Sequence, residues 1–251
     1  MPGEVSFSRL LSADDPATAA ELLAELRPQE RAPEGRPFVF VNMVSTIDGR
    51  AQVSGRTREL GDEADLEMLL ELRAIADAVL IGTGTLRAEG YARLIGSAGR
   101  RARREATGLA ADPTAVLLSR TLDLPWEAGL FADAGQPVLV YTAESAEAEA
   151  PETVAPVEVV RLPEATPAAM LADLRARGIA ALLSEGGPTL NHAMLDAGLV
   201  DELFLTIAPQ ITGEAEALRI VEGEGLAVPV RARPVWVLRA RGELFLRYAL
   251  Q

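Results

Sequence analysis

The chain has 251 residues, of which 49% are apolar, and a formal net charge of −13 at pH 7. This length suits one domain that can bury a sizeable core. The acidic charge argues against nucleic acid or an anionic membrane surface as the main partner. No apolar run approaches the roughly 20 residues of a membrane span, and the N-terminus lacks the layout of a secretory signal. We therefore expect a cytoplasmic protein with a small-molecule partner.

Two residue types limit the possible chemistry. The chain contains no cysteine and a single histidine, His192. It therefore has no thiolate nucleophile, no disulfide and no zinc site built from the usual ligands. A Ser-His-Asp triad would need His192 as its base, and no serine lies in a nucleophile-elbow motif. We expect His192 to be a bystander and a bound cofactor to supply the chemistry.

The apolar pattern predicts one α/β domain, residues 38–251, after an N-terminal extension, residues 1–37, that holds a short helix at 16–26. The basic run 100–104 falls in a long stretch that we expect to be irregular. Strands that alternate with helices predict a mostly parallel sheet with helices on both faces, and the last two strands predict an antiparallel C-terminal hairpin near Gly242. Strands are expected at 38–44, 78–82, 114–119, 137–142, 157–162, 179–185 and 201–209, and helices at 62–76, 83–89, 167–178 and 188–198.

Two segments at strand ends favour anion binding, because ligands of open α/β sheets bind beyond the carboxyl ends of the strands. In "GTGTLRAEGY", residues 82–91, Gly82 lets the backbone approach an anion closely, and Thr83 and Thr85 add hydroxyl donors. Ser119 and Arg120 follow another strand and could clamp the 2′-phosphate of NADPH. The alternatives are a threonine-capped strand–helix turn and a surface arginine.

A third segment, "SEGGPTLN" at 184–191, combines an acid, two glycines and a helix start. Pro188 suits the first helical position, so the N–H groups of Gly187, Thr189 and Leu190 would face a diphosphate across Gly186 and Gly187. Glu185 would accept hydrogen bonds from ribose hydroxyls. The alternative is a structural turn with an exposed glutamate.

A fourth segment, "VNMVSTIDGR" at 41–50, places polar side chains around a strand end. Asn42 and Asp48 bracket this end and could share it with a substrate. Asp48 and Gly49 alone would indicate only a turn, and Arg73, near the end of its helix, would alone be taken for a solvated charge.

Together these segments resemble the reductase family of riboflavin biosynthesis, whose fold is dihydrofolate-reductase-like. The resemblance spans about residues 38–248 and rests on three ordered motifs. "VNMVSTIDGRAQVSG" is similar to the family's strand that ends in Ser-Leu-Asp-Gly, and "LRAIADAVLIGTGTLRAE" to its Leu-Arg-x-x-x-Asp-Ala-Val-Leu-x-Gly-x-Gly-Thr-Val segment. "SEGGPTLNHAMLDAGLVDELFLTIAPQITG" is similar to its Glu-Gly-Gly-Pro-x-Leu and Leu-Val-Asp-Glu block. The resemblance implies a homodimer.

The resemblance also assigns site residues. Asn42 and Asp48 would line the cleft, with Asp48 as general acid and Glu185 as the other catalytic candidate. Three residues, Thr57, Arg73 and Glu185, match positions that contact the substrate. The positions that contact NADPH are matched by Ser45, Thr85, Glu89, Ser119 and the run from Gly187 to Ala193, which includes Asn191.

The implied reaction is the NADPH-dependent reduction of a ribosylamino-pyrimidine phosphate, with hydride transfer to C1 of the opened ribose. The family's Pro-x-Leu-Thr-Val-Arg, whose arginine helps to hold the substrate phosphate, is replaced here by "GYARLIG". Arg93 or the run 100–104 could substitute for it. Without cysteine, the chain cannot contain the zinc deaminase domain of bifunctional members. The alternatives are a dihydrofolate-reductase-like or deazaflavin-dependent reductase of another small molecule, and a catalytically silent nucleotide-binding protein.

Overall fold

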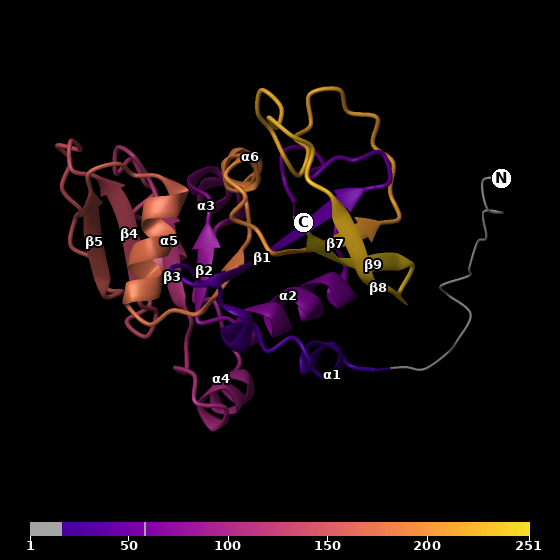
Figure 1. The fold of residues 1–251 in the computed structure, drawn as a ribbon, viewed down its shortest axis with the longest axis horizontal. Coiled ribbons are helices and arrows are strands. Elements are labelled where there is room, and N and C mark those ends of the chain that lie inside the picture. The colour runs from indigo at the N-terminus through magenta and orange to yellow at the C-terminus, as the bar shows by residue number, and fades with distance from the viewer. Residues whose placement is uncertain (1–16, 58) are drawn as a thin grey trace.

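A computed structural model describes residues 17–57 and 59–251, and nine strands of this part form one sheet (Figure 1). Their bounds are β1 (Phe38–Thr46), β2 (Ala78–Ile81), β3 (Thr114–Leu118), β4 (Val138–Ala143), β5 (Val157–Leu162), β6 (Ala181–Ser184), β7 (Glu202–Ala208), β8 (Ala232–Ala240) and β9 (Glu243–Leu250).

The strand order across the sheet is β5-β4-β3-β2-β6-β1-β7-β9-β8. The first seven strands in this order are parallel, and β9 pairs antiparallel with both β7 and β8. The sequence prediction of a mostly parallel sheet with an antiparallel C-terminal hairpin is therefore confirmed.

Helices cover both faces of the sheet, as predicted. The helices are α1 (Ala19–Leu23), α2 (Glu63–Ile75), α3 (Thr83–Glu89), α4 (Ala98–Ala106), α5 (Pro167–Ala176) and α6 (Pro188–Asp196), with short 3-10 turns η1 (Pro28–Arg31) and η2 (Gly129–Phe131). Leu72 of α2 and Leu86 of α3 join one apolar cluster, whereas Leu171 of α5 and Met194 of α6 join another. In Figure 1, α1, α2 and α4 accordingly lie apart from α5 and α6.

The central strands are buried on both faces, which explains their almost continuous apolar sequence. All four residues of β2 and all four of β6 are buried. Strand β1 lies beside β6, and residues 38–41 of β1 are paired with residues 181–184. Because β2, β6 and β1 are neighbours and parallel, the segments that follow them leave the same edge of the sheet.

The expectation of an irregular stretch around the basic run 100–104 is wrong, because these residues lie within α4. Three contacts explain the helix. The Ser97 hydroxyl caps its N-terminus, and Arg100 and Arg103 both bind the buried carboxylate of Glu71 on α2. The expected helix at 16–26 is shorter, Ala19–Leu23, and Pro16 lies outside the described residues.

The described part of the N-terminal extension packs against the domain. Leu23 and Leu26 are both 1% exposed and belong to the apolar cluster that contains Leu72. Arg36 forms a bidentate pair with Asp201, which precedes β7. The division of the chain at residue 37 stays a prediction. Within residues 17–57 and 59–251, no helix is long and apolar enough to cross a membrane.

Candidate functional site at the carboxyl ends of the central strands

Two glycine segments touch at the ends of β2 and β6. The amide of Gly82 donates to the carbonyl oxygen of Gly186 over 2.5 Å. A Cβ at Gly82 would overlap the backbone nitrogen of Gly187, so only glycine fits at this position. Gly186 has a φ of +79°, in the left-handed region that glycine adopts without strain. The two glycine motifs, about 100 residues apart in sequence, therefore form one backbone surface.

Helices α3 and α6 both begin at this surface. Their N-cap residues are Gly82 and Gly187, and neither start has a side-chain cap. The N–H groups of a first helical turn have no partner within the helix, so both starts present donors to an anion. Thr85 lies between them, because its hydroxyl oxygen would be 3.0 Å from a Cβ at Gly187.

Asn191, on α6, is buried behind this surface. Its side-chain nitrogen donates to the carbonyl of Ile220 over 2.8 Å. Its carbonyl oxygen Oδ1 is also buried and has no hydrogen-bond partner among the described residues. His192, next in sequence, hydrogen-bonds the carbonyl of Gly225 through Nε2 at 2.9 Å.

A buried ion pair lies beside the glycine surface. Arg73 of α2 binds Glu185, the residue after β6, through Nε–Oε1 at 2.6 Å and Nη2–Oε2 at 2.7 Å. The side chain of Arg73 is 12% exposed and that of Glu185 is 4% exposed. The alternatives of a solvated arginine and an exposed glutamate are therefore wrong. Burial lowers the pKa of Arg73, but the Glu185 carboxylate raises it, and the net shift is upward.

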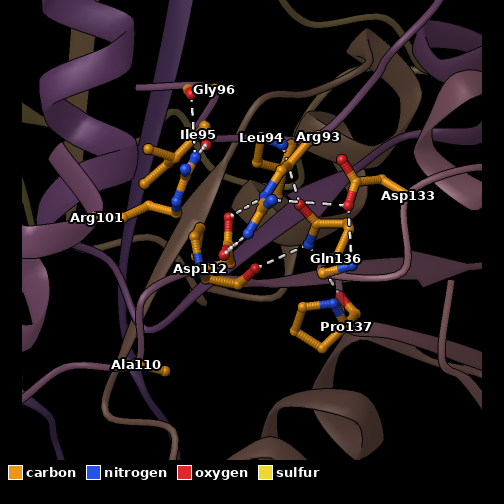
Figure 2. Close-up of polar contacts among 12 residues, drawn as sticks. Arg93, Leu94, Ile95, Gly96, Arg101, Ala110, Asp112, Asp133, Gln136 and Pro137 are labelled. Carbon is orange, nitrogen blue, oxygen red and sulfur yellow. Dashed lines mark hydrogen bonds and ion pairs between the residues drawn. The ribbon is translucent and has the colours of Figure 1, made fainter. Parts of the chain in front are cut away.

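Residues 91–96 complete this arrangement, and the sequence interpretation did not single out their contacts. The Tyr91 hydroxyl donates to Glu185 Oε2 over 2.7 Å, and the carbonyl of Leu94 accepts from Arg73 Nη1 over 3.1 Å. Figure 2 shows what holds this segment: the fully buried Gln136 accepts from the Leu94 amide, and Arg93 pairs with Asp112. No local pattern marks Tyr91, which simply follows the C-cap glycine of α3.

Thr57 and Glu89, which the resemblance assigns to substrate and cofactor respectively, lie in direct contact. The Thr57 amide donates to Glu89 Oε1 over 2.8 Å, and its hydroxyl donates to the carbonyl of Ala51. The loop before α2 is thereby attached to the end of α3. Ser45, near the end of β1, is 4% exposed and donates to the carbonyl of Thr46.

Asp48 lies on the exposed side of the loop after β1. Its carboxylate accepts from the amides of Thr212 and Gly213, the latter at 2.8 Å. The Thr46 hydroxyl, together with these amides, lowers the pKa of Asp48 to about 2. Asp48 is therefore an anion at neutral pH. Asn42, half-buried in β1, is paired in register with Phe204 of β7.

Ser119 and Arg120 follow β3, two positions across the sheet from β6. Ser119 is 7% exposed and its amide donates to the carbonyl of Tyr141, whereas Arg120 is exposed. Within the described part of the chain, Arg120 forms no salt bridge.

Comparison with known proteins shows the family of the chain. Residues 37–241 match the model of the RibD C-terminal domain. The chain belongs to this family. Over 199 residues it is 32% identical to the 2,5-diamino-6-ribosylamino-4(3H)-pyrimidinone 5′-phosphate reductase of Methanothermobacter thermautotrophicus. This alignment covers 76% of this chain and 86% of the relative.

Solved structures show the same RibD C-terminal fold. A pyrimidine reductase-like protein of Corynebacterium diphtheriae superposes with a TM-score of 0.78 at 26% identity, covering 94% of this chain and 99% of that one. The deaminase/5-amino-6-(5-phosphoribosylamino)uracil reductase of Thermotoga maritima gives a TM-score of 0.69 at 25% identity, covering 85% of this chain and 56% of that one. The named relatives are pyrimidine reductases, which supports an oxidoreductase activity.

One departure from the RibD pattern is the absence of the arginine expected after α3. The arginines that follow it here are bound within the protein. Arg93 pairs with Asp112, Arg101 donates to the carbonyls of Ile95 and Gly96, and the buried Arg104 donates to four backbone carbonyls. These contacts indicate that Arg93 and the arginines of α4 stabilise the fold. They argue against the prediction that one of these arginines replaces the missing arginine as a ligand of the substrate phosphate.

Proposed function

We propose that this RibD C-terminal domain protein is an NADPH-dependent reductase of a ribosylamino-pyrimidine phosphate. The contact between Gly82 and Gly186, which joins two helix starts into one donor surface, is the observation that carries the proposal. This surface lies beside the Arg73–Glu185 pair, so a dinucleotide and a sugar substrate have adjacent places. The same edge of the sheet is where ligands of open α/β sheets bind.

The residues fit a dinucleotide on physical grounds. Because Gly82 has no Cβ, its backbone can contact that of Gly187, and the starts of two helices then face one place where a phosphate could bind. The first-turn N–H groups of α6 and the hydroxyls of Thr83 and Thr85 would donate to the diphosphate. Ser119 and Arg120 would bind the 2′-phosphate. When bound, NADPH supplies the hydride that reduces C1 of the opened ribose.

On the substrate side, Arg73, Glu185, Thr57 and Asn42 would bind and orient the sugar and the pyrimidine. Alignment of the reacting carbons is worth about 7–11 kcal/mol of the barrier when the geometry is good. Asp48, an anion at neutral pH, would favour the positively charged iminium form of the opened ribose. A role for Asp48 as general acid would first require that it gain a proton.

Two pyrimidines are candidate substrates, because the named relatives act on different ones. One is the 2,5-diamino-pyrimidinone form and the other is the 5-amino-uracil form. The bound state of Arg93 and of the α4 arginines favours one further candidate, a reductase of a related molecule without this phosphate. This candidate is a dihydrofolate-reductase-like or deazaflavin-dependent reductase of another small molecule.

The direct test mixes pure protein with NADPH and each pyrimidine, and follows the absorbance of the reduced nicotinamide. Oxidation of NADPH with one of the phosphorylated pyrimidines supports the proposal, and the ratio of kcat/KM values identifies the substrate. NADPH binding without oxidation by any pyrimidine, measured by calorimetry, would indicate a silent nucleotide-binding protein. Two further reactions test this alternative: one with dihydrofolate as the substrate, and one with a reduced deazaflavin in place of NADPH.

We also propose that the protein is a homodimer through the face of β7 and β9. Alternate residues of these strands are apolar and stay half-exposed in the single chain. They form the cross-strand pairs Leu203–Tyr248, Leu205–Leu246 and Ile207–Leu244. A continuous apolar face of this kind is typical of an interaction surface.

A further inference from the structure

Three donors from the described residues occupy the carboxylate of Glu185, which leaves one acceptor position for a substrate. A carboxylate offers about four lone-pair positions, two on each oxygen. Oε2 receives two donors, Arg73 Nη2 and the Tyr91 hydroxyl, both at 2.7 Å. Oε1 receives one, Arg73 Nε at 2.6 Å. The remaining position is therefore on Oε1, and 4% exposure of the side chain leaves little room beyond one contact.

Tyr91 is the donor that distinguishes the two oxygens, since Arg73 binds both. Its ring packs against the apolar cluster on the α2 side of the sheet, and the Arg73 guanidinium lies 5.5 Å from the ring centroid. The Tyr91 hydroxyl can also be removed by a substitution that changes neither the charge of the site nor the ring. Burial and the neighbouring carboxylate raise the pKa of Tyr91, so its proton remains in place.

The segment that carries Tyr91 is held in place by hydrogen bonds of Leu94. Leu94, three residues later, contacts Arg73 through its carbonyl and Gln136 through its amide. Gln136 is fully buried and also donates to the carbonyls of Pro113 and Pro137 (Figure 2). Residues 91–94 therefore contact both Arg73 and Glu185, and Gln136 anchors them to the buried interior.

We propose that Tyr91 is a positioning residue that sets the specificity of the substrate site. It occupies Glu185 Oε2 and leaves Oε1 to accept one hydrogen bond from a substrate hydroxyl or N–H. The inference rests on the proposed function, because that function makes Glu185 a substrate ligand. Without the Tyr91 hydroxyl, Oε2 opens to water or to a second donor, and the orientation of the bound sugar loosens.

Tyr91→Phe tests this role, because it removes one hydroxyl and keeps the ring. The matched control is Tyr141→Phe. Tyr141 is fully buried in β4 and donates in the same way to a carboxylate, Asp173 Oδ2, at 2.8 Å, but on α5. We expect Tyr91→Phe to raise KM for the pyrimidine about 10-fold, with kcat changed less than KM and the Kd of NADPH unchanged. Tyr141→Phe should leave all three quantities unchanged.

A KM within twofold of the wild type in Tyr91→Phe, or an equal rise in Tyr141→Phe, overturns the proposal. If the wild type reduces no pyrimidine, the proposed function fails and the specificity role fails with it, and a readout independent of activity then tests whether the Tyr91 hydroxyl positions Glu185. This readout is a double-mutant cycle of Tyr91→Phe and Glu185→Gln in urea unfolding. Coupling of about twofold or more in the unfolding equilibrium constant supports the contact, and additivity overturns it.

Discussion

Arg73 and Glu185 join α2 to the end of β6 through a bidentate ion pair that is almost completely buried. Planar guanidinium and carboxylate groups match in this geometry, and each of the two side chains makes one further hydrogen bond. Arg73 Nη1 donates to the Leu94 carbonyl, and Glu185 Oε2 accepts from Tyr91. The pair therefore combines two roles: it stabilises the packing of α2 on the sheet and presents a carboxylate at the proposed substrate site.

Glu185→Gln should damage both roles. The change leaves Arg73 charged, buried and without its counter-ion, and breaking one partner of such a pair costs about 3–5 kcal/mol. We expect this loss in the free energy of unfolding, measured with urea, and a large rise in KM for the pyrimidine. The Kd of NADPH should change little, because the cofactor surface is formed by other residues.

Replacement of both partners separates charge from packing. In Arg73→Met/Glu185→Gln no buried charge is left alone, so the double variant should be more stable than Glu185→Gln. Activity should stay low in both. A double variant as unstable as the single one would contradict the role of the unpaired charge.

Gly82→Ala should disrupt the contact between the two glycine segments. The new Cβ would overlap the backbone of Gly187, which cannot move as a flexible side chain can. Overpacking of this kind costs about 1–3 kcal/mol, and we expect the Kd of NADPH to rise at least about 10-fold, measured by calorimetry.

Gly99→Ala is the matched control for this change. Gly99 lies in α4, outside the proposed cofactor surface, and a Cβ there would make only an ordinary contact, 3.7 Å from the Ser97 hydroxyl oxygen. Alanine is the better helix former by up to about 1 kcal/mol, so stability should stay equal or rise. Equal effects of the two substitutions on NADPH binding would contradict the importance of the glycine contact.

The sheet and the glycine surface could be predicted from sequence because both leave local signals. Buried parallel strands have continuous apolar runs, and Gly186, Gly187 and Pro188 mark a turn into a helix wherever they occur. The partners of Arg73 could not be predicted in this way. Arg73 and Glu185 are 112 residues apart in the sequence, and Tyr91 and Glu185 are 94 residues apart. Only the resemblance placed Arg73 and Glu185 in one site.

Helix α4 was missed because its sequence is mostly basic and its apolar residues, Ala98, Ala102 and Ala106, are small and exposed. Its stability comes from tertiary contacts: Arg100 and Arg103 on Glu71, and Arg104 inserted beneath the end of α2. A run of arginines normally predicts a solvated or ligand-binding segment. Here the arginines instead bind carbonyls and a carboxylate that are distant in sequence, and no local pattern predicts those partners.

Arg120→Ala should separate the two nicotinamide cofactors. Arg120 is exposed after β3, and in the proposed site it binds the 2′-phosphate that only NADPH carries. We expect the Kd of NADPH to rise about 10-fold or more and that of NADH to change less than about twofold. Arg239→Ala, an exposed arginine of β8, serves as the control for loss of charge. Equal losses for NADPH and NADH would remove Arg120 from the phosphate site.

Leu246→Asp should prevent the proposed dimer. Leu246 lies in the middle of the apolar face of β9, opposite Leu205, so a charge there would be buried without a partner on association. We expect light scattering after size exclusion to give a dimer for the wild type and a monomer for Leu246→Asp. Val154→Asp, at a 65% exposed position before β5, should stay dimeric. A monomeric wild type would contradict the proposed interface.

Glu243 should make stability fall with rising pH. This carboxyl, at the start of β9, is 1% exposed; its Oε1 accepts from the Asp62 amide, and its Oε2 has no partner among the described residues. Burial raises the pKa of Glu243 to about 7, and the carboxylates of Asp62 and Asp65 act in the same direction. The folded state therefore holds the proton more tightly than the unfolded chain. Its contribution is complete below about pH 4.5 and is lost as the pH passes 7.

Glu243→Gln keeps the acceptor for the Asp62 amide and removes the titration. The variant should show a flatter free energy of unfolding between pH 5 and pH 8, measured with urea, and should equal or exceed the wild type at pH 8. Glu25→Gln, at an exposed position after α1, should follow the wild-type curve. An unchanged slope in Glu243→Gln would show that this carboxyl does not bind its proton more tightly in the folded state.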